Sequence, residues 1–206
     1  VIVESPAKCR KIEEYLGPGY VCLASMGHFR EIAKMEDIDV ANGFAITFTE
    51  MNKVTTKKKA LAVIRVAARS ADTVVLATDD DREGEAIAWH LCDALGLNVE
   101  TTPRIVFHEI TRTAVCAAMT RPTRINMNVV RAQQARQVID MLVGYHISPL
   151  LWKRVCRTYS ASNGKRGGGS SAFSAGRCQT PALRLIYDAS LAECNKKQVD
   201  GPSATA

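Results

Sequence analysis

The sequence has 206 residues, of which 47% are hydrophobic, and a formal net charge of +6. This is enough chain to bury a core and form one domain plus part of another. No stretch approaches 18 uninterrupted apolar residues and no signal-peptide pattern occurs, so we expect an intracellular location and no membrane partner. The seven cysteines form no C-x-x-C pair, which disfavours a zinc site and predicts reduced thiols.

The charge is distributed unevenly along the chain. Residues 1–120 contain 14 Lys/Arg and 17 Asp/Glu, whereas residues 121–206 contain 13 and 4. An acidic part joined to a basic part suits a protein that grips a phosphate backbone with one part and does chemistry with the other. A basic surface that only improves solubility is the alternative.

Apolar periodicity predicts alternating strands and helices in the first part of the chain. After a short apolar run at 1–3, the expected elements are a helix over 6–16, strands over 20–24 and 44–50, a helix over 57–70, a strand over 73–78, a helix over 83–95, a strand over 104–109 and a helix over 112–119. Segment 31–42 is irregular, and we expect loop and a short helix there. This alternation predicts an α/β fold with a mostly parallel sheet and helices on both faces.

Five carboxylates lie within seven residues where the strand over 73–78 gives way to a helix: Asp79, Asp80, Asp81, Glu83 and Glu85. Their mutual repulsion indicates a bound cation or a phosphate-handling reaction. In extended chain, residues i and i+2 share a side, so Asp79 and Asp81 should point the same way, with Glu83 just beyond. Such an open set of carboxylates favours Mg²⁺ as the cofactor. Asp80 should face away from these acids, and Glu85 fits an ordinary first-turn acid stabilised by the helix dipole. The alternative for the whole cluster is a solvated acidic helix start.

Glu4 directly follows the apolar run at the start of the chain, and Ser5 and Pro6 suit a helix cap and first helical residue. Because parallel strands place their carboxyl ends at one edge of the sheet, Glu4 should meet the cluster around Asp79. Lys8, one turn into the helix, could offer a positive charge to a phosphate there. Taken alone, Lys8 also fits an ordinary surface lysine.

The pattern becomes helical from about residue 128. One apolar stripe contains Ala132, Ala135, Ile139 and Leu142, and another face contains Gln133, Arg136, Gln137 and Asp140. Gly144 and Pro149 should end this helix. Spacing alone favours an amphipathic helix with an Arg136–Asp140 ion pair.

Two later segments lack a core pattern. Residues 158–171 are rich in glycine and serine and predict a mobile basic loop. Residues 191–206 lose periodicity and predict a frayed tail.

Seven segments, in order along the chain, resemble the successive motifs of type IA DNA topoisomerases. They are V-I-V-E-S-P-A-K (1–8), S-M-G-H-F-R-E-I (25–32), A-T-D-D-D-R-E-G-E-A-I-A-W-H-L (77–91), F-H-E-I-T (107–111), A-Q-Q-A-R-Q-V-I-D (132–140), G-Y-H-I-S-P-L-L-W (144–152) and S-A-G-R-C-Q-T-P-A-L (174–183). The G-H-F-R-E form is closer to the topoisomerase I branch than to the topoisomerase III branch. The resemblance implies a Rossmann-like Toprim domain over 1–122 and a helical DNA-binding segment over 123–190.

The resemblance also implies roles for individual residues. The catalytic set is Glu4, Lys8, Asp79, Asp81 and Glu83, and its four acids form the metal set. The partner would be the phosphate backbone of single-stranded DNA, held by Lys8, His28, Arg82, Gln134, Arg136, Asp140, Ser174, Arg177 and Gln179. Gln137 departs from the family, which usually has a second arginine there, and a neutral amide contacts phosphate more weakly.

The activity implied is Mg²⁺-dependent breakage, passage and rejoining of one DNA strand through a phosphotyrosine. None of the five tyrosines has the family's nucleophile context; Tyr159 comes nearest but has Ala161 where an arginine is expected. The chain alone is therefore predicted to be inactive. We expect the remaining topoisomerase domains as partners and a DNA-associated location, in the cytoplasm and nucleoid or in a nucleus or organelle. Another Toprim enzyme, a primase or nuclease, and a non-catalytic nucleic-acid-binding fragment are the alternatives.

Overall fold

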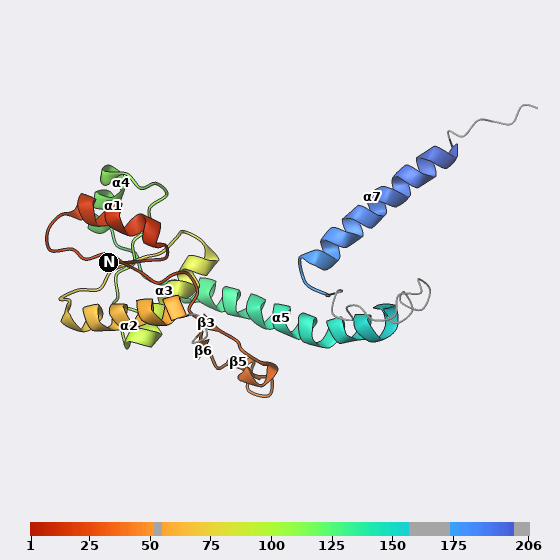
Figure 1. The fold of residues 1–206 in the computed structure, drawn as a ribbon, viewed down its shortest axis with the longest axis horizontal. Coiled ribbons are helices and arrows are strands. Elements are labelled where there is room, and N and C mark those ends of the chain that lie inside the picture. Colours follow the sequence, from red (N-terminus) through yellow and green to blue (C-terminus); the bar gives the residue numbers. More distant parts are fainter. Residues whose placement is uncertain (52–54, 157–173, 200–206) are drawn as a thin grey trace, which may run out of the picture. The chain divides into compact units, whose positions relative to one another are not determined.

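The computed structural model describes residues 1–51, 55–156 and 174–199 (Figure 1). The chain divides into two compact units, Val1–Gln137 and Val138–Ala206, which are described separately. The predicted loop over 158–171 and the tyrosine at 159 lie outside the described residues.

A three-stranded parallel sheet forms the centre of the first unit. Its strands are ordered β2 (Leu23–Ala24), β1 (Ile2–Val3), β7 (Leu76–Ala77). Beyond β7, Arg104 forms two isolated bridges, a parallel one with Leu76 and an antiparallel one with Thr123. The predicted parallel sheet is confirmed, but the strand expected over 104–109 is reduced to this bridge.

Helices cover both faces of the sheet, as predicted. Their bounds are α1 (Pro6–Leu16), α2 (Thr55–Ser70), α3 (Arg82–Leu95) and α4 (Arg112–Thr120). Figure 1 shows α1 beside α4, and these two helices are in close contact. All four lie within two residues of their expected bounds at each end, because their apolar periodicity and start signals are local in the sequence.

Alternation along the strands produces two separate cores. Ile2 and Leu76 point into one core, which contains buried side chains of α2 and α3. Val3 and Ala77, the next residues, point into the other core, which contains buried side chains of α1 and α4. Side chains of successive strand residues point to opposite faces, so each two-residue strand contributes to both layers.

Two small antiparallel pairs account for the region between β2 and α2. Strand β3 (Arg30–Glu31) pairs with β6 (Thr49–Glu50), and β4 (Ile38–Asp39) pairs with β5 (Ala45–Ile46). A 3₁₀ turn, η1 (Met35–Asp37), precedes β4. The single strand predicted over 44–50 was therefore wrong, because its two halves pair with different partners.

His90 of α3 lies in an aromatic pocket within the first core. It is 2% exposed, and neither ring nitrogen has a partner among the described residues. The rings of Phe29, Phe48 and Trp89 meet it edge to face. Burial, with smaller contributions from nearby Arg30 and His28, lowers the pKa of His90 from 6.5 to about 4.

This lowered pKa predicts an acid-sensitive fold. The unfolded chain takes up a proton on His90 more readily than the native state does. The stability that the protein owes to keeping His90 neutral is therefore complete above pH 6.5 and is lost as the pH falls through about 4. His90→Phe should remove this part of the pH dependence, which is worth about 3 kcal/mol. Urea unfolding across that pH range measures it, and an unchanged acid slope in the variant would contradict the prediction.

The remaining helices differ from expectation. Helix α5 (Met127–Leu151) continues through Gly144 and contains Pro149, and a π-helical turn, η2 (Trp152–Cys156), follows it. Helix α7 (Gln179–Val199) extends to the end of the described residues. The predicted helix end at Gly144 and Pro149 was therefore wrong, and so was the frayed tail as far as residue 199; residues 200–206 lie outside the described part.

The apolar stripe predicted on α5 is largely exposed. Ala132, Ala135 and Ile139 are exposed, and Leu142 is half-buried. The α5 residues buried in the first unit are Val130 and Gln133, so a glutamine of the predicted polar face is buried instead. Of the helices that the structure describes, none is both long enough and apolar enough to cross a membrane.

Candidate active site

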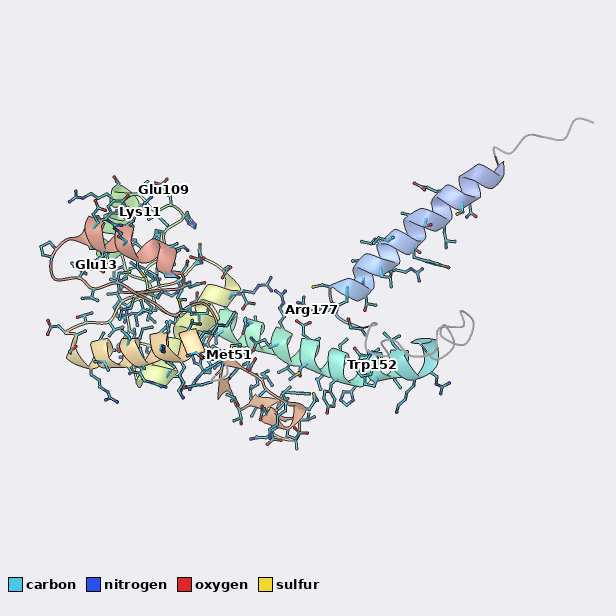
Figure 2. The ribbon with its side chains drawn as sticks, viewed as in Figure 1. Lys11, Glu13, Met51, Glu109, Trp152 and Arg177 are labelled. Atoms are coloured by element: carbon cyan, nitrogen blue, oxygen red, sulfur yellow. The ribbon has the colours of Figure 1, made fainter. Side chains whose placement is uncertain are left out.

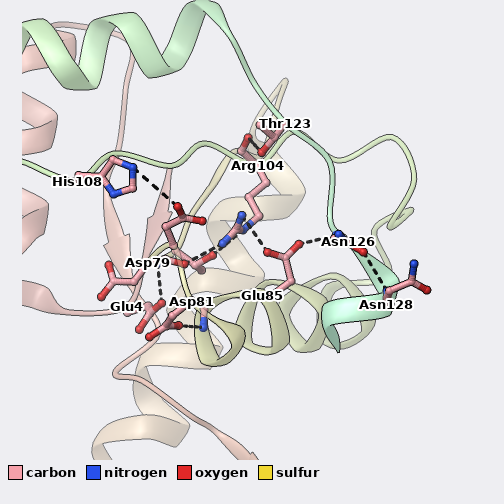
Figure 3. A network of polar contacts seen from close by, with 12 residues as sticks. Glu4, Asp79, Asp81, Glu85, Arg104, His108, Thr123, Asn126 and Asn128 are labelled. Carbon is pink, nitrogen blue, oxygen red and sulfur yellow. Dashed lines mark hydrogen bonds and ion pairs between the residues drawn. The ribbon is translucent and has the colours of Figure 1, made fainter. Parts of the chain in front are cut away.

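Glu4 and Asp79 meet at the carboxyl edge of the parallel sheet, as their positions after β1 and β7 predicted (Figure 3). The backbone N–H of Asp79 donates to Oε1 of Glu4 at 2.8 Å. Burial raises the pKa of Glu4, and the charges of Asp79 and Asp81 raise it further, while that hydrogen bond and Lys8 act in the opposite direction. Glu4 is thus a carboxylate that a cation would stabilise.

Lys8 reaches the acidic cluster from the first turn of α1. Its Nζ forms an ion pair with Oδ1 of Asp79, and the Asp79 side chain is 50% exposed. Lys8 therefore lies where the sequence placed it, but it neutralises an acid here. A phosphate entering the site would offer it a second partner.

Asp81 caps α3. Its Oδ1 accepts a hydrogen bond from the backbone N–H of Gly84 at 2.7 Å. Gly84 permits this turn, because a Cβ atom at that position would lie 2.2 Å from the backbone oxygen of Asp79. The start of α3 thus packs directly against the loop that carries the acids.

Glu83 points to a different place from Asp81. Its Oε2 lies 2.6 Å from Nε2 of His28 and accepts a hydrogen bond from Nε2 of Gln133 at 3.1 Å. His28 follows a turn in which Met26 and Gly27 both have positive φ, 64° and 73°. The structure therefore brings His28 to the acidic cluster, with Gln133 as a partner that the sequence did not indicate.

Glu85 and Arg104 form a buried ion pair beneath the acidic loop (Figure 3). Nη1 of Arg104 lies 3.0 Å from Oε2 of Glu85, and the two side chains are 4% and 8% exposed. Arg104 also donates to Oγ1 of Thr78 at 3.0 Å and to the backbone oxygen of Asp79 at 2.8 Å. Glu85 accepts from the backbone N–H of Asn126. The expectation of an ordinary first-turn acid at Glu85 was therefore wrong.

Asp80 lies apart from the other acids. Its Oδ2 is 3.8 Å from Nε2 of His108, and both side chains are more than half exposed. This agrees with the expectation that Asp80 faces away from the metal set.

The predicted convergence of the metal set is not present. Among the described residues, no three His, Cys, Asp or Glu side chains lie close enough to hold a metal ion. The acids do not share a direction as their i, i+2 spacing predicted, because Asp79, Asp81 and Glu83 each turn to a separate partner. The donor set still fits Mg²⁺ chemically, since all four of its members are carboxylates. Burial raises the pKa of Glu4, and the charges of Asp79 and Asp81 raise it further.

The residues expected to bind DNA fall in two places. In the first unit, Gln134 and Arg136 of α5 are half-buried, Arg82 is exposed, and none of the three has a polar partner in the described chain. In the second unit, Arg177, labelled in Figure 2, donates from Nε and Nη2 to both oxygens of Asp140, at 2.9 and 3.3 Å.

This pairing replaces the alternative expected from spacing alone. Asp140 binds Arg177, so the Arg136–Asp140 ion pair is not formed. The hydrogen bonds that Arg177 donates to Asp140 also raise the pKa of Arg177. Ser174 and Gln179 lie together, with Nε2 of Gln179 donating to Oγ of Ser174 at 3.3 Å.

Comparison with known proteins identifies both parts of the chain. The Toprim domain family matches residues 1–110, more than half of the chain, and the DNA topoisomerase family matches residues 124–200. The chain belongs to the type IA DNA topoisomerase family.

A solved topoisomerase has a similar fold over most of this chain. Full-length topoisomerase I from Thermotoga maritima matches 73% of this chain with 39% sequence identity and a TM-score of 0.66. The chain spans only 25% of that topoisomerase. The family resemblance and the Toprim fold predicted from the motifs are therefore confirmed.

Proposed function

We propose that this chain provides the Mg²⁺-binding module and part of the DNA-binding surface of a type IA topoisomerase. The whole enzyme would break one DNA strand through a phosphotyrosine, pass DNA through the gap and reseal it, and so control supercoiling. The observation that carries the proposal is the meeting of Glu4, Lys8 and Asp79 at the carboxyl edge of a parallel sheet. The DNA topoisomerase match over 124–200 favours this function over that of a primase or nuclease.

Mg²⁺ would be held by Glu4, Asp79, Asp81 and Glu83, and it would neutralise charge on the DNA phosphate when bound. One oxygen of Glu4 and one of Asp81 each accept a hydrogen bond from a backbone N–H, and one oxygen of Glu83 contacts His28 and Gln133. The second oxygen of each of these three carboxylates has no partner in the described chain. Lys8 would exchange its contact with Asp79 for the phosphate. Residues 1–122 would form the Toprim domain and 123–190 the DNA-binding segment.

Single-stranded DNA would lie against a set of basic, amide and hydroxyl side chains together with the carboxylate of Asp140. The contacts would fall on phosphates and would carry little sequence preference. His28, Arg82, Gln134 and Arg136 would serve in the first unit, and Asp140, Ser174, Arg177 and Gln179 in the second. Such a protein would act inside the cell, where its DNA is.

Asp81→Asn should weaken Mg²⁺ binding while leaving the fold intact. Asparagine keeps the side-chain oxygen that caps Gly84 and is an equally good cap, so only the charge is removed. Titration calorimetry with Mg²⁺ on both proteins measures the effect, with the melting temperature as the control for folding. Indistinguishable Mg²⁺ affinities would show that the acids form a solvated helix start.

Arg136→Ala should make binding to single-stranded DNA less dependent on salt. Loss of one phosphate contact flattens the plot of log affinity against log salt by about one unit. Arg65→Ala is the matched control, because Arg65 lies on α2 and is paired with Glu50. If the slope changes equally in both variants, or in neither, Arg136 does not contact the DNA phosphates.

A further inference from the structure

Gln133 is a buried polar side chain in a position suited to an apolar one. It is 1% exposed and lies one helical turn after Val130, which is completely buried in the first core. Its Oε1 has no hydrogen-bond partner among the described residues. Burying an unpaired amide oxygen costs free energy that a methionine or leucine would avoid. Packing alone therefore does not explain a glutamine here.

The other end of the same amide explains it. Nε2 of Gln133 donates to Oε2 of Glu83 at 3.1 Å, and Nε2 of His28 lies 2.6 Å from that same oxygen. The terminal torsion of a glutamate is broad, so an unrestrained carboxylate samples many orientations. Two neighbours on one oxygen fix the plane of the Glu83 carboxylate and leave Oε1 for another ligand.

Gln133 also connects Glu83 to the helix proposed to bind DNA. It directly precedes Gln134 in the sequence and lies one turn before Arg136 on α5. A displacement of this turn by a DNA phosphate would move the Gln133 amide, and the amide would carry the Glu83 carboxylate with it. All of these residues belong to the first unit.

We propose that Gln133 is a positioning residue that orients Glu83 for Mg²⁺ and couples this orientation to single-stranded DNA bound on α5. The inference rests on the proposed function, because it assumes that Glu83 is a metal ligand. It adds to that function a residue that acts through Glu83 and contacts neither metal nor DNA.

Gln133→Met separates this role from a structural one. Methionine has a similar length and removes the unpaired oxygen, and Glu83 is 43% exposed and keeps His28, so the melting temperature should be unchanged or higher. Mg²⁺ affinity should fall roughly tenfold, as for other residues that orient metal ligands. A short oligothymidylate should tighten Mg²⁺ binding in the parent chain and do so much less in the variant.

Two further variants make the result decisive. Ile125→Val trims the same core without removing a polar group, so it should lower the melting temperature and leave Mg²⁺ affinity unchanged. Gln133→Met combined with Glu83→Gln should bind Mg²⁺ no more weakly than Glu83→Gln alone, because the first change acts through the second residue.

The outcomes distinguish this inference from the proposed function. If the parent chain binds Mg²⁺ and Gln133→Met binds it equally well, or the two changes add, the inference is wrong and the proposed function stands. A lower melting temperature with unchanged affinity would assign Gln133 a structural role. If the parent chain binds no Mg²⁺ even with the oligonucleotide, the proposed function fails and the inference with it.

Discussion

Arg104→Met should lower the free energy of unfolding by about 3–5 kcal/mol, because it leaves the buried Glu85 carboxylate without its charged partner. The guanidinium also holds Thr78 and the backbone oxygen of Asp79, so the acidic loop loses two hydrogen bonds. Urea unfolding at neutral pH measures the loss. A loss below about 1 kcal/mol, the value typical of exposed pairs, would mean that water reaches this ion pair.

A double variant controls for the ion pair itself. Replacing Arg104 and Glu85 together with methionine removes both charges, and buried pairs replaced by apolar residues often lose little stability. The double variant should therefore be more stable than Arg104→Met. A double variant that is less stable by the sum of both single losses would contradict the buried-charge explanation.

Gly84→Ala should be destabilising by about 1–3 kcal/mol, as overpacked sites are. The new Cβ would lie 2.2 Å from the backbone oxygen of Asp79 and 2.9 Å from its nitrogen, and backbone atoms cannot rotate out of the way. The loop would have to move, so Mg²⁺ binding should weaken as well. Calorimetric melting and an Mg²⁺ titration on the same sample measure both effects.

Gly144→Ala is the matched control for that substitution. Gly144 lies within α5, and a Cβ atom there would meet nothing within 4 Å. Alanine should stabilise the helix by about 0.5–1 kcal/mol relative to glycine. If Gly84→Ala proves as harmless as Gly144→Ala, the close approach of α3 to the acidic loop is not present in solution.

The parts of the site that follow local rules could be predicted from the sequence. Helix 6–16 has its expected bounds because its start signals lie within a few residues. The meeting of Glu4 with Asp79 followed from the rule that parallel strands end at one edge. The order of the seven motifs identified the family before any geometry was known.

Contacts between distant residues could not be predicted. Arg104 and Glu85 lie 19 residues apart in the sequence, and nothing in their local patterns separates a buried pair from two surface charges. Gln133 was assigned to the polar face of its helix, because periodicity treats a buried amide as an exposed one. The i, i+2 rule gave Asp79 and Asp81 a common direction, but hydrogen bonding at the start of α3 turned Asp81 toward Gly84.

DNA relaxation tests the proposed function most directly. In Thermotoga maritima topoisomerase I, this chain would replace the matching segment, and the hybrid would be incubated with negatively supercoiled DNA. We expect Mg²⁺-dependent relaxation by the hybrid and none by its Asp81→Asn form. The isolated chain should give neither relaxation nor a denaturant-resistant protein–DNA adduct, because no described tyrosine lies at the acidic site and Tyr159 lacks the family's context. Equal relaxation by the hybrid and by its Asp81→Asn form would contradict the proposed function. So would an adduct on the isolated chain that disappears in Tyr159→Phe.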